Sequence, residues 1–220
     1  MSLQLRPDVY WCVCGGRAVF LDTRGDRYFC LPQSDNDAFL RVAASQQLPS
    51  DAAQLRSLVE SKVLIEIGAL QSFRQPPMIK MPTHDVIEYS RRSISPAMLP
   101  MFLAEIRTAT ELRRRPLHEL LTAAREQPLQ TRRSSSEPVR ATEKIASAAA
   151  ALSFITGRHD RCLVRALAVH ALCKRNGSKA NLVFGVIAHP FTAHCWVQLG
   201  RAVVVGGYEH ARLYTPILVI

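Results

Sequence analysis

Two residues in the last third of the chain have the types and settings that nucleophilic chemistry needs. Cys162 lies in Asp160-Arg161-Cys162-Leu163, at the start of an amphipathic helical pattern, and His194 begins a strand-like run 32 positions later. A helix N-terminus favours a thiolate through its dipole and its free backbone N–H groups. A neighbouring imidazole can accept the thiol proton and later protonate a leaving amine. The pair predicts a cysteine peptidase or an acyltransferase.

Other residues compete for both roles. A cysteine is often only a small buried apolar residue, and Cys173 and Cys195 are interpreted as core thiols. Because side chains alternate along a strand, Cys195 should point away from the face that carries His194. Three further histidines are less well placed, within the nucleophile helix, in a loop and after the strands: His170, His189 and His210.

The elements around the pair follow a recognisable order. We expect a helix from Cys162 to the turn before Gly177, with Asp160 as its N-cap and Gly177 at the C′ position. Helical patterns also cover about 96–126, with Pro100 and Pro116 as breaks, and about 139–155. Strands are predicted at 181–186, 195–199 and 201–205. The chain thus has a helix, then the helix that carries the nucleophile, then antiparallel strands. Papain-like and transglutaminase-like cysteine enzymes have this order in their core.

The N-terminal third predicts a second unit. Residues 9–31 alternate as a three-stranded meander with two turns. Helical patterns follow at 35–44 and 49–59, and 64–68 is a last strand or a helix end. The fold class is therefore α+β. We expect a winged-helix-sized domain at 1–75, a proline-marked linker at 76–95 and a catalytic domain at 96–220.

Composition limits the functional classes. The 220 residues carry a net charge of +10, but the basic residues do not gather on one recognition helix, which argues against nucleic acid as the partner. The chain shows neither a secretory signal nor an apolar run of membrane-spanning length. We therefore expect a cytoplasmic protein with free thiols and no membrane association. Cys12 and Cys14 lack the further ligands of a zinc site, so no metal is expected.

Four segments of the C-terminal part form a recognisable set in order and spacing: Arg161-Cys162-Leu163-Val164-Arg165-Ala166-Leu167-Ala168, Val183-Phe184-Gly185-Val186, Pro190-Phe191-Thr192-Ala193-His194-Cys195-Trp196-Val197 and Tyr214-Thr215-Pro216-Ile217-Leu218. They resemble the lasso-peptide biosynthesis B proteins, which are transglutaminase-like leader peptidases, and the resemblance covers about 140–220. The N-terminal residues 16–22 and 27–32 resemble the PqqD-like recognition element that such proteins carry, here fused.

This resemblance implies a function and two partners. The N-terminal domain would bind the leader of a ribosomally made precursor peptide, and the C-terminal domain would remove that leader. A separate asparagine-synthetase-like cyclase would then close the macrolactam, using ATP that this chain does not bind, so no cofactor is expected. Strand addition to a sheet edge would capture the leader. The expected contact residues are Arg27, Tyr28, Phe29, Leu55, Leu58 and Val59.

One departure from the family pattern concerns the third catalytic residue. The family has an aspartate on the strand after the histidine, and Gly206 stands at that position here. Glu209 or Asp160 would substitute for it, or a backbone carbonyl or Gln198 would orient the ring, or the enzyme would be slow or inactive. We expect a working Cys162–His194 dyad, because a cysteine needs less assistance than a serine. The Cys162 N–H would contribute to the oxyanion hole.

Three other classes of function remain open from the sequence. The chain could be a leader-binding scaffold for the cyclase without activity of its own, which the glycine at 206 suggests. Its charge and N-terminal domain size would also fit a winged-helix DNA-binding regulator. The same dyad would serve an arylamine-acetyltransferase-like or transglutaminase-like activity, recognised by acyl transfer to an added amine.

Overall fold

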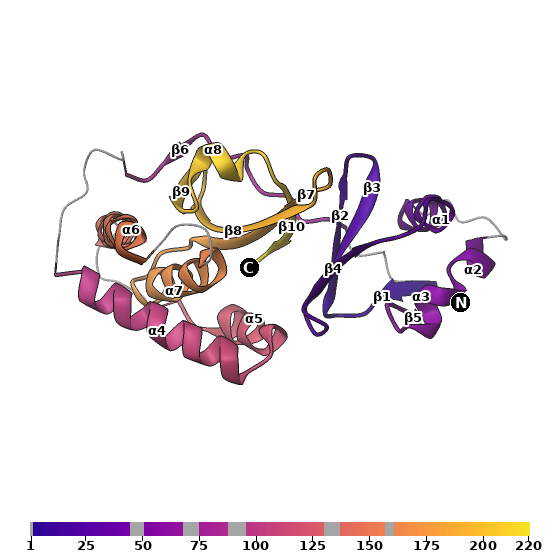
Figure 1. The fold of residues 1–220 in the computed structure, drawn as a ribbon, viewed down its shortest axis with the longest axis horizontal. Helices are drawn as coiled ribbons and strands as arrows, with labels where there is room; N and C mark the ends of the chain where they lie inside the picture. Colours follow the sequence, from indigo (N-terminus) through magenta and orange to yellow (C-terminus); the bar gives the residue numbers. More distant parts are fainter. Residues whose placement is uncertain (1, 45–50, 68–74, 88–95, 130–136, 157–160) are drawn as a thin grey trace. The chain divides into compact units, whose positions relative to one another are not determined.

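The computed structural model describes residues 2–44, 51–67, 75–87, 96–129, 137–156 and 161–220. The fold is α+β and divides into two compact units. The first comprises Met1–Met78 with Val186–Thr192 and Thr215–Leu218, and the second comprises Ile79–Gly185, Ala193–Tyr214 and Val219–Ile220. Figure 1 labels the elements on a ribbon whose colours follow the sequence.

The first unit begins with the predicted meander. β2 (Val9–Cys14), β3 (Arg17–Asp22) and β4 (Arg27–Cys30) form an antiparallel sheet in the order β2-β3-β4, which confirms the three strands and both turns. The helices that follow are α1 (Gln33–Ala43), α2 (Asp51–Gln54) and α3 (Arg56–Glu60).

A strand that the sequence analysis missed completes this unit. β1 (Ser2–Leu5) pairs antiparallel with β5 (Leu64–Ile67), which closes the unit on itself. Four residues are too few to show the alternation of apolar and polar side chains that indicates a strand. The core between the sheet and α1 is aromatic: the rings of Phe20 and Phe39 meet edge to face at 4.7 Å, and Trp11 meets Phe39 at 5.0 Å.

The second sheet has five strands in the order β10-β7-β8-β9-β6. Its strands are β6 (His84–Asp85), β7 (Asn181–Ile187), β8 (Thr192–Leu199), β9 (Ala202–Val205) and β10 (Thr215–Val219). The predicted strands at 181–186, 195–199 and 201–205 correspond to three of these. The one-turn helix α8 (Tyr208–Ala211) lies between β9 and β10 and was not predicted.

Four long helices accompany this sheet: α4 (Met98–Arg114), α5 (Leu117–Glu126), α6 (Glu137–Thr156) and α7 (Cys162–Arg175). Helices α4, α6 and α7 pack on one another, and α6 and α7 both contact β9 (Figure 1). Pro116 separates α4 from α5 as predicted. Pro100 does not break α4, because it lies in the first turn, where no helical N–H is lost.

Part of the segment assigned to the linker belongs to the second sheet. β6 pairs in parallel with β9, and hydrogen bonds of 2.9 and 2.8 Å join Thr83 N to Arg201 O and Val86 N to Val203 O. Gln198 Nε2 also donates to the Lys80 carbonyl. A strand of two residues has no periodicity, so no local pattern predicts this attachment.

Candidate active site

Cys162 is the first residue of α7. Arg161 occupies the N-cap position, with φ −128° and ψ 19°, and its carbonyl accepts the Arg165 N–H at 2.9 Å. The predicted N-cap, Asp160, lies outside the described residues, and the observed N-cap is one residue later than predicted. Cys162 therefore carries one of the first backbone N–H groups of the helix, which have no partner within the helix itself.

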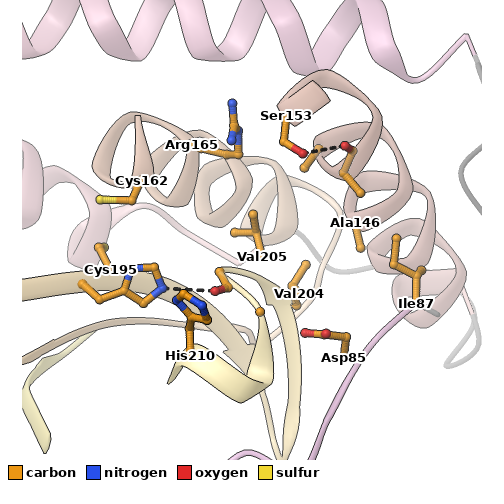
Figure 2. A pocket seen from close by; sticks show the side chains of 15 residues that line it. Asp85, Ile87, Ala146, Ser153, Cys162, Arg165, Cys195, Val204, Val205 and His210 are labelled. Carbon is orange, nitrogen blue, oxygen red and sulfur yellow. Dashed lines mark hydrogen bonds between the residues drawn. The ribbon is translucent and has the colours of Figure 1, made fainter. Parts of the chain in front are cut away.

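A backbone carbonyl orients the His194 ring. His194 Nε2 lies 3.1 Å from the Gly206 carbonyl oxygen (dashed in Figure 2). A carbonyl oxygen can only accept, so Nε2 must carry the hydrogen. In the neutral ring Nδ1 is then the unprotonated nitrogen, with a lone pair available for a proton. The position that holds an acid in the resembling family thus supplies a main-chain acceptor here.

Aromatic rings hold the same imidazole. The Trp196 ring stacks near it with a centroid distance of 5.9 Å and an interplanar angle of 18°, and the Tyr214 ring lies 5.2 Å away. Burial lowers the pKa of His194, the hydrogen bond to Gly206 opposes this change, and the nearby His210 lowers the pKa further. The neutral form is therefore favoured at pH 7, which suits a general base.

Two glycines make this arrangement sterically possible. Gly206 has φ +117°, and a Cβ atom there would lie 2.5 Å from Trp196 Cβ and 3.2 Å from His194 Nε2. A Cβ on Gly185 would lie 2.7 Å from the Trp196 ring and 2.8 Å from Tyr214 Cβ. Both positions need glycine because neighbouring atoms occupy the side-chain space.

Cys162 and His194 line one pocket of about 300 Å³ in the second unit. Asp85 from β6 and His210 from α8 line it as well (Figure 2). Asp85 Oδ1 accepts the Tyr208 N–H at 2.9 Å. Burial raises the pKa of Asp85, the Tyr208 N–H and His84 lower it, and Glu209 raises it.

The two other thiols on α7 and β8, Cys173 and Cys195, are core residues. Cys173 is buried, and burial raises its pKa to about 12. Cys195 is 4 % exposed, and burial raises its pKa well above the usual range, with Cys162 adding to the rise. Cys195 nevertheless lines the same pocket as Cys162, although strand alternation placed it on the face away from His194. Only Cys162 combines partial exposure with a helix N-terminus.

The cation beside the pocket is balanced by a buried acid. Arg165 Nε donates to Glu105 Oε1 at 2.8 Å, and the two side chains are only 5 % and 1 % exposed. Glu105 is on α4 and Arg165 is one turn after Cys162 on α7. This ion pair joins the two helices and offsets the positive charge that the sequence placed near the thiol.

The remaining candidates for the orienting group lie elsewhere. Glu209 is exposed, and its carboxylate is 3.5 Å from the Tyr208 hydroxyl. Gln198 is buried, but its amide oxygen accepts the Trp196 indole N–H at 3.0 Å and its amide nitrogen donates to the Lys80 and Gly200 carbonyls. Among the described residues, the hydrogen bond from the His194 ring goes to Gly206.

The residues expected to bind a leader fall into two groups. Arg27, Tyr28 and Phe29 form part of β4, which among the described residues pairs only with β3 and so is an edge strand. Leu55 and Leu58 are core residues with 0 % and 6 % exposure, and Val59 packs against that core. Those three side chains serve the interior of the first unit. Phe29 packs against the same core, with its ring stacked on Phe20 at a centroid distance of 5.0 Å.

The described residues hold no cluster of three or more His, Cys, Asp or Glu placed to bind a metal ion. Within the same ranges, no helix is sufficiently long and apolar to cross a membrane.

Comparison with known families agrees with this geometry. The family model for the transglutaminase-like superfamily matches residues 102–219, which is more than half of the chain. The chain therefore belongs to the transglutaminase-like superfamily. No curated protein and no solved structure matches it. The matched region contains Cys162, His194 and Gly206 but not Asp85, which the sequence analysis missed because it lies in the segment taken for a linker.

Proposed function

We propose that this protein is a cysteine peptidase that removes the leader from a ribosomally synthesised lasso precursor peptide. The observation that carries the chemistry is the hydrogen bond between His194 Nε2 and the Gly206 carbonyl, in a pocket shared with Cys162. It leaves His194 Nδ1 as the basic atom. The leader as substrate rests on the resemblance of the motifs around Cys162 and His194 and of residues 16–32.

The proposed reaction has two halves. As Cys162 Sγ attacks the carbonyl carbon of the last leader residue, its proton passes to His194 Nδ1. The Cys162 N–H stabilises the oxyanion. The C–N bond then breaks, and His194 returns the proton to the departing amine of the core peptide. In the second half His194 takes a proton from water as the oxygen attacks the thioester carbonyl. The C–S bond then breaks to release the leader with a new carboxyl group, and His194 returns the proton to Cys162 Sγ.

Mass spectrometry of a synthetic precursor peptide tests this assignment. Wild type should release leader and core, whereas Cys162→Ala and His194→Ala should lower the rate at least about 1,000-fold. Cys14→Ala removes a half-buried thiol of β2, outside the proposed catalytic and capture sites, and should cleave like wild type. If all four proteins are inactive with and without the cyclase while the leader still binds, the scaffold function replaces the peptidase. An acylated product in the presence of an added amine would instead indicate a transferase.

We propose further that β4 captures the leader by strand addition. Its free edge offers backbone groups to an extended peptide. The Arg27 guanidinium lies 5.5 Å from the centre of the Phe29 ring, which stacks on Phe20 of the core. Arg27 itself is 61 % exposed, so an acidic leader side chain would find a complementary cation here.

A matched pair of charge reversals tests the capture site. Arg27 on β4 and Arg24 in the preceding turn are 61 % and 64 % exposed, and both contact an aspartate. Arg27→Glu should weaken binding of a fluorescent leader peptide about 5-fold or more, whereas Arg24→Glu should change it less than about 2-fold. Equal effects of the two variants would place the leader elsewhere.

A further inference from the structure

Asp85 lies beside the candidate site although it is 77 residues before Cys162 in the sequence. Backbone pairing holds it there: Asp85 is opposite Val203 in the parallel ladder of β6 and β9, and the Val86 N–H donates to the Val203 carbonyl at 2.8 Å. The side chain lines the pocket, as Figure 2 shows. A carboxylate is therefore fixed next to the segment that follows β9.

That segment consists of two glycines in succession. Gly206 and Gly207 have φ +117° and +76°, and Tyr208 begins α8 directly after them. Glycine has the widest conformational freedom of any residue, so these two do not define their own geometry. The Tyr208 N–H, donated to Asp85 Oδ1 at 2.9 Å, fixes the end of the segment from outside.

The orientation of the histidine depends on this same segment. The carbonyl that accepts from His194 Nε2 belongs to Gly206, two residues before Tyr208. We propose that Asp85 is a positioning residue of the Cys162–His194 dyad, which holds the Gly206 carbonyl in place by binding the Tyr208 N–H. This inference rests on the proposed function, because it assigns a role within the same dyad.

The chemistry separates this role from two others that Asp85 could have. A positioning residue needs only an oxygen that accepts from Tyr208 N–H, and the amide of asparagine supplies one. If Asp85 stabilised a charged imidazolium, or bound a cation on the substrate, the negative charge itself would be needed. Asp85→Asn therefore preserves the first role and removes the other two.

The donor can be removed independently of Asp85. Proline is tolerated at the first position of a helix and has no N–H. Gly207 has ψ 122°, which suits a residue before proline. Tyr208→Pro should thus abolish the hydrogen bond while Asp85 stays intact, and Tyr208→Ala is its control, because it removes the ring and keeps the N–H.

The rate at which iodoacetamide alkylates Cys162 measures how strongly His194 activates the thiol, and it requires no substrate. The rate would be followed by mass spectrometry of the Cys162 peptide from pH 5 to 9, with thermal unfolding of every variant. His194→Ala should lower the rate at pH 6.5 and move the profile to higher pH. Asp85→Ala and Tyr208→Pro should move it in the same direction, with about a tenfold fall for a shift of about one pH unit. Asp85→Asn, Tyr208→Ala and the control Glu209→Ala, which changes an exposed side chain outside the pocket lining, should stay within about twofold of wild type.

The outcomes separate the two proposals. If His194→Ala matches wild type, the dyad itself fails, and the positioning role fails with it. If His194→Ala is slow while Asp85→Ala and Tyr208→Pro match wild type, the dyad stands and the positioning role is refuted. A profile of Asp85→Asn as altered as that of Asp85→Ala would also refute it, because charge rather than position would then matter. If Asp85→Ala does not fold, the profiles of Tyr208→Pro and Asp85→Asn still test the positioning role.

Discussion

The two compact units bury their polar groups in different ways. In the first unit, the buried Asn36 side chain accepts the Ala18 N–H at 2.8 Å, and Asp22 accepts the Gly25 N–H at 3.0 Å and binds Arg6. In the second, Glu105 and Arg165 form an ion pair in which both side chains are buried. Among the described residues, buried side-chain atoms without a hydrogen-bond partner occur in both units, for example Arg6 Nε in the first and His170 Nδ1 in the second. In the first unit these buried side chains accept hydrogen bonds from backbone N–H groups, which satisfies both partners and favours stability. The second buries both partners of an ion pair, whereas the arginines that pair with buried Asp22 and Asp51 in the first unit are 20 % and 34 % exposed, and burying both charges costs stability.

Removing one buried polar group from each unit should give the largest difference between the two units in lost unfolding free energy. Glu105→Ala takes the carboxylate from a guanidinium that is 5 % exposed, which should cost about 3–5 kcal/mol of unfolding free energy. Asn36→Ala leaves the Ala18 N–H without its acceptor and should cost about 1–3 kcal/mol.

The two tryptophans allow each loss to be measured in its own unit. Trp11 belongs to the core of the first unit, and Trp196 packs beside His194 in the second. Urea unfolding of Glu105→Ala would be followed by Trp196 fluorescence in a Trp11→Phe background. Asn36→Ala would be followed by Trp11 in a Trp196→Phe background. Equal losses would remove the contrast between the units.

Lowering the pH should destabilise the second unit before it destabilises the first. Burial lowers the pKa of His170 to about 4, and Lys174 contributes. The unfolded chain binds this proton near the ordinary value of about 6.5, so the stabilisation is present above that pH and is lost as pH falls toward 4. The difference amounts to about 3 kcal/mol.

The first unit should respond only at lower pH. Burial alone would raise the pKa of Asp22, but the Gly25 N–H and Arg6 hold it below 3.8, so its contribution persists above that value and is lost below it. Trp196 fluorescence should therefore report weaker resistance to urea at pH 4.5 than at pH 7, while Trp11 changes little. His170→Leu should remove most of the slope seen by Trp196; an unchanged slope would assign it to other groups.

The same contrast explains what the sequence could predict. The meander and the helices were readable because their patterns are local: β2 to β4 are short runs divided by turn residues such as Gly15-Gly16 and Gly25, and α7 begins and ends where Cys162 and Gly177 indicate. The nucleophile and base candidates were readable by type and setting. The parts of the site that depend on distant pairing were not, since nothing local in a two-residue strand places Asp85 beside Tyr208.

The orienting group illustrates this limit best. Side-chain types are visible in a sequence, whereas a main-chain carbonyl belongs to every residue and carries no signal of its own. Gly206 was therefore interpreted first as a missing acid, with a carbonyl as one alternative among several. Its positive φ and the closeness of Trp196 show that the backbone has the conformation of a glycine and delivers its carbonyl to the ring.

Restoring the acid of the resembling family should therefore weaken this protein. An aspartate at 206 would adopt φ +117° and bring Cβ to 2.5 Å from Trp196 Cβ, which should cost about 2 kcal/mol or more of unfolding free energy. Because the neighbouring backbone must shift, the carbonyl would leave His194, and cleavage and Cys162 alkylation should fall together. Gly200→Asp is the matched control, since it also has positive φ, at +62°, but nothing within 4 Å of its Cβ. Gly206→Asp with wild-type or faster cleavage would instead mean that the carboxylate assumes the family role and that the carbonyl is dispensable.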